Sequence, residues 1–209
     1  MIKAVIFDMG GVVLPLDIPR CMDNFRKKAG LVDIDKYLDA YHQRGFIGDL
    51  EAGKIDEDEF YTECLSHCTP GTSRETVAEC FASLLEPCRE EALTLFRELQ
   101  GQYDLYILSN NNPISKKAFC AEMIQRGIDP DKVFRKQFYS FQMKLLKPSR
   151  EFYEKAIEGT GVKPGEILFI DDSQVNCDAA SALGIKAVYY DVNTSLYELV
   201  KSSLAAFNG

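Results

Sequence analysis

The chain has 209 residues, enough for one core domain with a smaller insertion, since single domains cluster at about 100 to 150 residues. Its composition, 46% hydrophobic and 27% charged, is typical of a soluble globular protein, and no apolar run approaches the ~20 residues that cross a bilayer. The formal net charge of -8 disfavours nucleic acids and anionic membranes as partners, because both carry negative charge.

The cysteines and the first residues bear on the compartment. Seven cysteines, an odd number, are scattered without a CxxC pair, which is typical of reduced thiols rather than of a disulfide framework. Residues 1–5 lead directly into a strand-like run, without the long apolar segment and cleavage site of a signal peptide. We therefore expect a cytoplasmic protein.

The first predicted element is a buried strand over Ala4–Phe7, within the stretch VIFDMGGVVL. A carboxylate inside such an apolar strand would carry a large desolvation penalty, so Asp8 is expected where the strand ends. Gly11 suits a sharp bend after the strand, because glycine adopts backbone dihedral angles that are costly for other residues.

Residues 16–86 are predicted to form a helical insertion, because they are helix-patterned, rich in charge and free of convincing strand runs. Glycines and the turn Thr69-Pro70-Gly71 separate the helical patterns. The candidate helices cover residues 19–29, 34–44, 57–67 and 74–85.

Beyond the insertion, strand-like runs alternate with helix-period segments. The predicted strands cover residues 105–108, 167–170 and 186–190. The predicted helices cover residues 90–99, 149–157 and 174–183. This alternation indicates an α/β fold, with a parallel sheet and helices packed on it.

Polar residues follow three of the predicted strands: Asp8, then Ser109-Asn110-Asn111, then Asp171-Asp172-Ser173. Lys147-Pro148 lies between the second and third of these groups. Taken singly, each group is explained as a turn, a helix cap or a solvated lysine. Because the carboxyl ends of parallel strands line one ligand-binding crevice, their joint placement favours a common site.

The segments FDMGGVVL, ILSNN, KP and FIDD, in this order, resemble the four motifs of the haloacid dehalogenase-like hydrolase superfamily. The likeness is to its phosphatases with a helical cap inserted after the first strand. It implies a Rossmann-like core of residues 1–15 plus 87–209 and a cap of residues 16–86. It also implies Mg2+ dependence and an aspartyl-phosphate intermediate.

The resemblance assigns catalysis to Asp8 and Lys147. A carboxylate is ionised at neutral pH, so Asp8 needs no general base before it attacks phosphorus. Lys147 would neutralise both the phosphate and Asp8. Ser109 and Asn110 would hold the phosphoryl oxygens by hydroxyl and amide hydrogen bonds, assisted by backbone amides around Met9.

The resemblance also implies a magnesium site, since Mg2+ prefers an octahedron of oxygen ligands. Its ligands would be Asp8, the backbone carbonyl of Gly10 and Asp172. Asp171 would lie close by or bind through water.

Gly10 departs from the family pattern, in which a second aspartate two residues after the nucleophile protonates the leaving group. General acid catalysis contributes about 10^2 to 10^4 in rate, and its loss matters least for acidic leaving groups. We therefore expect a phosphatase that favours substrates with acidic leaving groups, such as sugar 1-phosphates, acyl phosphates, pyrophosphate or aryl phosphates. Asp17 is an alternative acid, but Ile18-Pro19 after it favours a helix N-cap.

Other candidates lie in the insertion. His67 with Cys64 and Cys68 would make an incomplete zinc site, and a buried helix face explains the cysteines better. His42 also lies in the insertion, so a Ser-His-Asp triad in the core is disfavoured. The side chains that could select substrate are Tyr37, Tyr41, Phe46, Arg20 and Arg44.

Several functions remain as alternatives to a phosphatase for a small phosphorylated metabolite. A dehalogenase is disfavoured because Asp171-Asp172 would repel an anionic haloacid without a cation between them. A phosphomutase lacks its acid–base group at Gly10. A catalytically weak or inactive phosphate- or partner-binding module is the alternative from another class. The protein is expected to be a monomer or a small homo-oligomer.

Overall fold

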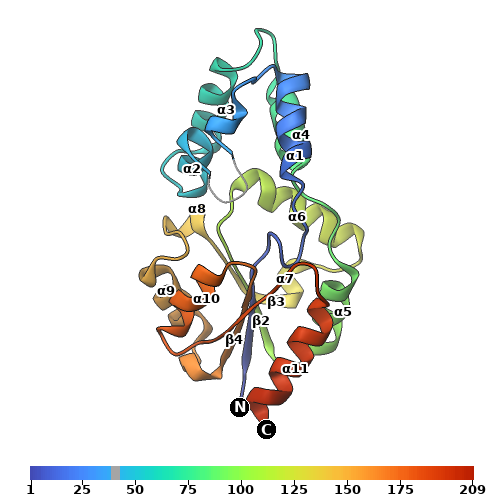
Figure 1. The fold of residues 1–209 in the computed structure, drawn as a ribbon, viewed down its shortest axis with the longest axis vertical. Helices are drawn as coiled ribbons and strands as arrows, with labels where there is room; N and C mark the ends of the chain where they lie inside the picture. Colours follow the sequence, from blue (N-terminus) through green and yellow to red (C-terminus); the bar gives the residue numbers. More distant parts are fainter. Residues whose placement is uncertain (39–42) are drawn as a thin grey trace.

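A computed structural model describes residues 1–38 and 43–209. Its centre is a five-stranded parallel sheet in the order β3-β2-β1-β4-β5, with helices on both faces (Figure 1). The strands are β1 (Ala4–Phe7), β2 (Asp104–Ser109), β3 (Phe134–Tyr139), β4 (Ile167–Asp171) and β5 (Lys186–Tyr189). The predicted α/β fold with an inserted helical segment is confirmed.

The helices divide between the insertion and the rest of the chain. Those of the insertion are α1 (Ile18–Asn24), α2 (Gly45–Glu51), α3 (Glu57–Ser66) and α4 (Arg74–Ala82), with a π-helical segment at Phe25–Ala29 and a 3-10 turn at Ile34–Lys36. The others are α5 (Glu90–Leu99), α6 (Pro113–Gln125), α7 (Pro130–Val133), α8 (Ser140–Met143), α9 (Arg150–Thr160), α10 (Gln174–Ser181) and α11 (Leu196–Asn208), with a 3-10 turn at Pro164–Glu166.

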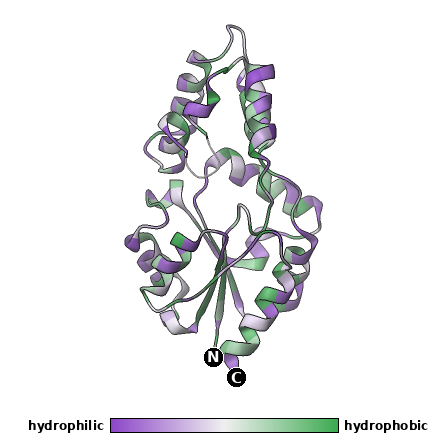
Figure 2. Cartoon of the chain, viewed as in Figure 1, coloured by the Kyte–Doolittle hydropathy of each residue, from purple (hydrophilic) through white to green (hydrophobic). Residues whose placement is uncertain are grey.

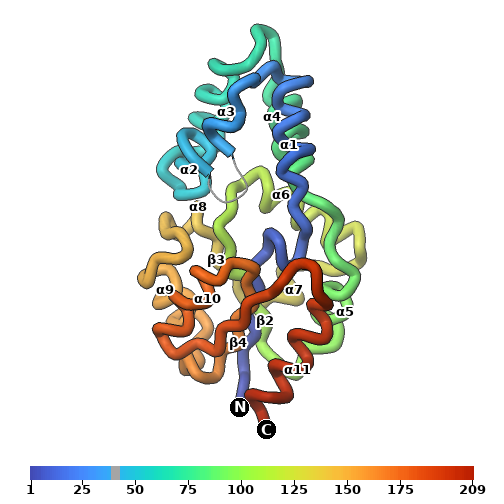
Figure 3. The backbone as a smooth tube through the Cα atoms, in the orientation of Figure 1, coloured from blue at the N-terminus to red at the C-terminus, as the bar shows by residue number. Residues whose placement is uncertain are grey.

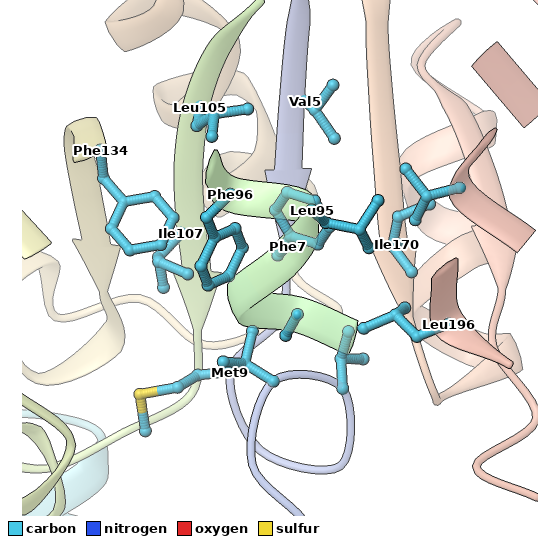
Figure 4. Close-up of a cluster of buried hydrophobic side chains, with 14 of the residues drawn as sticks. Val5, Phe7, Met9, Leu95, Phe96, Leu105, Ile107, Phe134, Ile170 and Leu196 are labelled. Atoms are coloured by element: carbon cyan, nitrogen blue, oxygen red, sulfur yellow. The ribbon is translucent and has the colours of Figure 1, made fainter. Parts of the chain in front are cut away.

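The side chains of β1 alternate between two apolar layers, as the period of two in a strand requires. Val5 and Phe7 face the layer formed with α5 and α11, where Phe7 meets Phe96 edge-on at 5.3 Å between ring centroids (Figure 4). Ala4 and Ile6 face the opposite layer, with α9 and α10. Both faces of the strand are therefore buried, which explains its unbroken apolar sequence. Figure 2 shows the contrast between apolar strands and mixed helices.

The insertion has an apolar core of its own, formed by side chains between Cys21 and Leu84, with Ile114 of α6 added. Its two connections to the sheet run side by side, one blue and one green in Figure 3. They pair through hydrogen bonds from Asp17 N to Leu84 O (2.8 Å) and from Glu86 N to Pro15 O (2.9 Å). The insertion thus rises from a paired two-segment stem above the carboxyl ends of the strands (Figure 1).

Several elements were not predicted. The strand β3 reads FRKQFY, whose exposed Arg135 and Lys136 interrupt the apolar run, because β3 is an edge strand. The helix α2 was not predicted, because Gly45 and Gly48 are poor helix formers and are among the glycines that separate the helical patterns. The helices α6, α7, α8 and α11 were not predicted either.

The helix predicted over residues 34–44 is wrong in its described part. There the chain makes only a 3-10 turn, and Gln43 forms a bridge with Leu38. Residues 39–42, with the candidates Tyr41 and His42, lie outside the described residues. Within the part of the chain that is described, no helix is both long and apolar enough to cross a membrane.

Candidate active site

Three predicted polar groups meet at the carboxyl edge of the sheet. Asp8 follows β1, Ser109 ends β2 and Asp171 ends β4, and β1 lies between the other two strands. The backbone N–H of Asp8 donates to Ile170 O of β4 at 2.9 Å, which extends the strand pairing to the nucleophile candidate. The order of the strands in the sheet, which differs from their order in the chain, therefore brings these residues together.

Asp8, Asp171 and Asp172 form a compact acidic group, in which one oxygen from each lies within 4.8 Å of the others. Asp8 is 8% exposed and Asp171 is fully buried. Burial raises the pKa of Asp8 to about 7; Lys147 opposes the rise, and Asp171 and Asp172 add to it. Burial, with Asp171 next, raises the pKa of Asp172 to about 6.

Lys147 is the cation of this site. Its Nζ lies 2.9 Å from Asp8 Oδ2 and 2.7 Å from Asp171 Oδ2, and its side chain is 1% exposed. Burial opposes its charge, but Asp171 and Asp8 outweigh burial and hold the pKa of Lys147 above its ordinary value. One lysine thus faces three carboxylates, so the site is short of positive charge. An all-oxygen donor set of this kind fits Mg2+.

Asn110 fixes the backbone of Lys147. Its Oδ1 accepts from Lys147 N at 2.8 Å, and its Nδ2 donates to Lys147 O at 3.0 Å. An amide nitrogen carries two protons, so one N–H of Asn110 stays available for a ligand. Asn110 therefore joins the second predicted motif to the third.

Asp171 has its polar contacts supplied by the protein. Its Oδ1 accepts from Ser173 N at 2.8 Å and from the Asn176 side chain at 2.9 Å, while Oδ2 accepts from Lys147. These contacts orient Asp171 toward the lysine. They leave Asp8 and Asp172 as the carboxylates with more freedom to take a further ligand.

The loop after β1 bends at Gly11, whose φ is +79°. Its N–H donates to Leu14 O at 2.8 Å, and a Cβ on this residue would overlap the Asp172 carboxylate. Gly11 therefore meets two requirements, a left-handed backbone and a close approach to Asp172.

Replacing Gly11 by alanine is expected to lower the catalytic efficiency, kcat/KM, about 10^2-fold, because a misplaced carboxylate disturbs the reaction geometry. The matched control is Gly101→Ala. Gly101 also has a positive φ, +86°, but its Cβ would meet nothing within 4 Å. In both variants, alanine in a left-handed backbone conformation should lower the free energy of unfolding by ~1 kcal/mol, which urea unfolding would measure. Only Gly11→Ala should also lose activity. Equal activity in the two variants would contradict the assigned contact.

Glu51, at the end of α2, is a buried carboxyl group that the sequence analysis missed. It is 9% exposed. Burial, with the charge of Asp8 next, raises the pKa of Glu51 to about 8, while a hydrogen bond with the Asn112 side chain opposes the rise. The available signal was that Glu51 follows Phe46, Ile47 and Leu50 on one helix, and it could not be used because α2 itself was not predicted.

Other candidate residues have structural roles, in a helix cap, in the stem or in the apolar core of the insertion. Asp17 caps α1, accepting from Arg20 N at 2.9 Å, as its sequence context predicted. Arg20 binds the stem of the insertion, donating to Ser83 O at 2.8 Å. Phe46 is buried in the apolar core of the insertion and stacks with His67, 5.7 Å between ring centroids.

Cys64 lies in the same core, and Cys68 Sγ donates to its carbonyl. Over residues 1–38 and 43–209, the acidic group of Asp8, Asp171 and Asp172 is the one cluster with metal-ligand geometry. The zinc alternative for Cys64, Cys68 and His67 is therefore not supported.

Comparisons with known proteins agree on one family. The model of the haloacid dehalogenase-like hydrolases matches residues 2–184. A D-ribitol-5-phosphate phosphatase from Bacteroides thetaiotaomicron is 32% identical over 187 residues, which cover 89% of this chain and 90% of that protein. A sesquiterpene phosphatase from Aspergillus oryzae is 28% identical, over 90% of this chain and 89% of that protein.

Solved structures show the same likeness. A family enzyme from Bacteroides thetaiotaomicron, crystallised as a mutant with magnesium and inorganic phosphate, superposes with a TM-score of 0.90. It is 30% identical, over 96% of this chain and 99% of that one. A hydrolase of the family from Porphyromonas gingivalis gives a TM-score of 0.88 at 30% identity, over 98% of both chains.

Proposed function

The chain belongs to the haloacid dehalogenase-like hydrolase family, and from this premise we propose that it is a Mg2+-dependent phosphatase acting through an aspartyl-phosphate on Asp8. The observation that carries the proposal is the buried Lys147, paired with both Asp8 and Asp171 at the carboxyl edge of the sheet. Two relatives named as phosphatases support it, as does the neighbour that holds magnesium and phosphate.

Asp8 is the nucleophile of the proposed reaction. The Met9 N–H donates to Asp8 Oδ1 at 2.6 Å and Lys147 holds Oδ2, so both oxygens of the carboxylate have fixed directions. Lys147 favours the ionised form of Asp8 against the effect of burial and attracts the phosphate, which is the electrostatic stabilisation that phosphoryl transfer mainly requires. In the proposal, the Ser109 hydroxyl and the second N–H of Asn110 bind the phosphoryl oxygens, with backbone amides around Met9.

The site residues fit Mg2+, because three carboxylates share a single lysine and all the donors are oxygens. The proposed ligands are Asp8, the carbonyl of Gly10 and Asp172, with Asp171 close by. When bound, the cation would supply charge neutralisation between the phosphate and the carboxylates.

Removing magnesium is expected to abolish phosphate release, and adding it back is expected to restore the activity. Mg2+ should also raise the melting temperature, because a ligand at 100 times its Kd stabilises the folded state by about 2.7 kcal/mol. Both are measured with EDTA-treated protein, by colorimetric phosphate assay and by differential scanning fluorimetry. Asp172→Asn should show a much smaller thermal shift, and undiminished release in EDTA would refute the metal dependence.

We further propose that residues 16–86 act as a cap over the core of residues 1–15 plus 87–209. The separate apolar core of the insertion and its paired stem support this division. A cap excludes water from the reaction and contributes side chains that select the substrate.

The seven cysteines, all free thiols, support the cytoplasm as the proposed compartment.

The proposed substrate is a small phosphorylated metabolite of the sugar- or polyol-phosphate type, as for the Bacteroides relative named a D-ribitol-5-phosphate phosphatase. Gly10 offers no proton donor, so the β1 loop by itself favours acidic leaving groups, and an ester of an ordinary alcohol requires an acid from another element. A panel of sugar, polyol, acyl and aryl phosphates tests the class. No release from any of them would favour a phosphate-binding module instead.

A further inference from the structure

Position 10 lies against an apolar side chain in this protein. A Cβ built on Gly10 would lie 3.2 Å from Leu16 Cδ1, a tight contact with the end of a flexible side chain. The β1 loop carries no acid at position 10. A proton for the leaving oxygen must come from another element, and alkoxide leaving groups need such a proton.

The end of α2 is docked on the core at the catalytic edge. The Ser140 hydroxyl donates to the backbone carbonyl of Glu51 at 2.6 Å, and accepts from Asn111 N at 2.9 Å. Asn111 follows Ser109-Asn110 directly, so one serine joins the insertion to the loop that is proposed to bind phosphate. Ser140 is fully buried, which protects these hydrogen bonds from water.

A second contact holds the residues that follow Glu51. A Cβ on Gly53 would overlap the backbone carbonyl of Phe141 in α8, so the chain passes directly against the core there. With the Ser140 hydrogen bond on Glu51 itself and this approach two residues later, the backbone that carries Glu51 is fixed relative to the catalytic edge.

The surroundings of the Glu51 side chain suit a proton donor. Glu51 is a buried residue whose backbone carbonyl is held by Ser140 beside Asn111. The charges of Asp8 and Lys147 act on the pKa of its carboxyl in opposite directions, Asp8 raising it and Lys147 lowering it. Asn112 caps α6 with Oδ1, accepting from Ser115 N at 2.9 Å, and a hydrogen bond with its side chain lowers the pKa of Glu51. Because burial and Asp8 raise the pKa of Glu51 to about 8, the group carries a proton at neutral pH.

We propose that Glu51, supplied by the insertion, protonates the leaving oxygen in place of the side chain that is absent at position 10. This inference rests on the proposed phosphatase function and deepens it. It also ties substrate choice to the cap, since the insertion that covers the substrate would contribute the acid. With Glu51 in this role, phosphate esters of ordinary alcohols become good substrates.

The proposed reaction has two steps, phosphoryl transfer to Asp8 and hydrolysis of the aspartyl-phosphate. An Asp8 oxygen forms a bond to phosphorus while the bond between phosphorus and the ester oxygen breaks, and the Glu51 proton moves to that oxygen to give the free alcohol. Water then attacks the phosphorus of the aspartyl-phosphate while the bond between phosphorus and the Asp8 oxygen breaks, which restores the Asp8 carboxylate, and the Glu51 carboxylate takes a proton from the water. Inorganic phosphate leaves, and both carboxyl groups return to their starting states.

The test compares wild type with Glu51→Gln, which keeps the size and polarity of the side chain but has no acidic proton. The probes are p-nitrophenyl phosphate, phenyl phosphate and ribitol 5-phosphate, in order of decreasing leaving-group acidity. We expect Glu51→Gln to lower kcat/KM about 10^2- to 10^4-fold on ribitol 5-phosphate and less than ~10-fold on p-nitrophenyl phosphate. Glu51→Asp, a shorter acid, should recover part of the loss.

The control is Asp49→Asn, which removes an exposed carboxylate from the same helix, where Asp49 pairs with Lys54. It should match wild type on all three substrates. An equal loss of kcat/KM by Glu51→Gln on every substrate would indicate a structural role. No loss on any substrate would mean that another residue is the general acid. Either result overturns the assignment. Failure of wild type to release phosphate from any probe would instead refute the proposed function. A melting temperature for each variant identifies misfolding.

Discussion

Asp8→Asn is expected to abolish phosphate release, lowering kcat/KM by ~10^4-fold or more, as removal of a catalytic nucleophile does elsewhere. An amide oxygen is a poor nucleophile and has no net charge for Lys147 to hold. The variant keeps the shape of the side chain, so the Met9 N–H still has an oxygen to bind. The measurement is colorimetric phosphate release at saturating Mg2+, together with mass spectrometry of the quenched enzyme for a phosphorylated residue 8.

The matched control for Asp8→Asn is Asp17→Asn. Asparagine caps a helix as well as aspartate does, so this variant keeps the α1 cap while it removes the alternative acid. We expect wild-type activity from it. Phosphate release that persists in Asp8→Asn, or a phosphoryl group found on another residue, would refute Asp8 as the nucleophile.

Lys147→Met is expected to have the second large effect, on both stability and activity. It removes the cation between Asp8 and Asp171, and breaking such a buried pair costs about 3 to 5 kcal/mol. The loss of a charge aimed at the phosphate should lower kcat/KM by roughly 10^3-fold or more. Urea unfolding measures the first effect and phosphate release the second.

The control for Lys147→Met is Lys144→Met, which removes an exposed lysine from the same segment. It should change the free energy of unfolding by less than about 0.5 kcal/mol. Saturating Mg2+ should return part of the stability that Lys147→Met loses, because a cation can again balance the carboxylates. If both lysine variants unfolded like wild type, the buried ion pairs would not contribute as described.

The predicted strands and helices of the core agreed with the structure wherever the local pattern was strong. The helix at Glu90–Leu99 was predicted to the residue, because its apolar positions recur with the helical period and Gly101 follows it. The predictions failed where tertiary context supplied the stability. The edge strand β3 tolerates charges on exposed positions, and α2 begins at Gly45 because Phe46, Ile47 and Leu50 are buried in the insertion.

The candidate site divides in a similar way. Asp8, Asp171 and Asp172 were predicted to share a site from their places after strands, and Lys147 from its position between two of the polar groups. The structure brings the four residues together. Their partners were beyond reach of the sequence. Nothing local to Asn110 indicates that it binds the backbone of Lys147, 37 residues away. No sequence pattern around Glu51 indicates that the charge of Asp8 raises the pKa of its carboxyl group.

The sequence by itself determined four of the five strands, the polar residues that end three of them and the family, because each depends on short patterns that are contiguous in the chain. The tertiary structure alone decided which carboxylates share a lysine, where α2 docks and which element can deliver a proton. These depend on burial and on distances between segments that lie far apart in the chain. A carboxyl group changes its chemistry with its surroundings, and only the folded chain defines those surroundings.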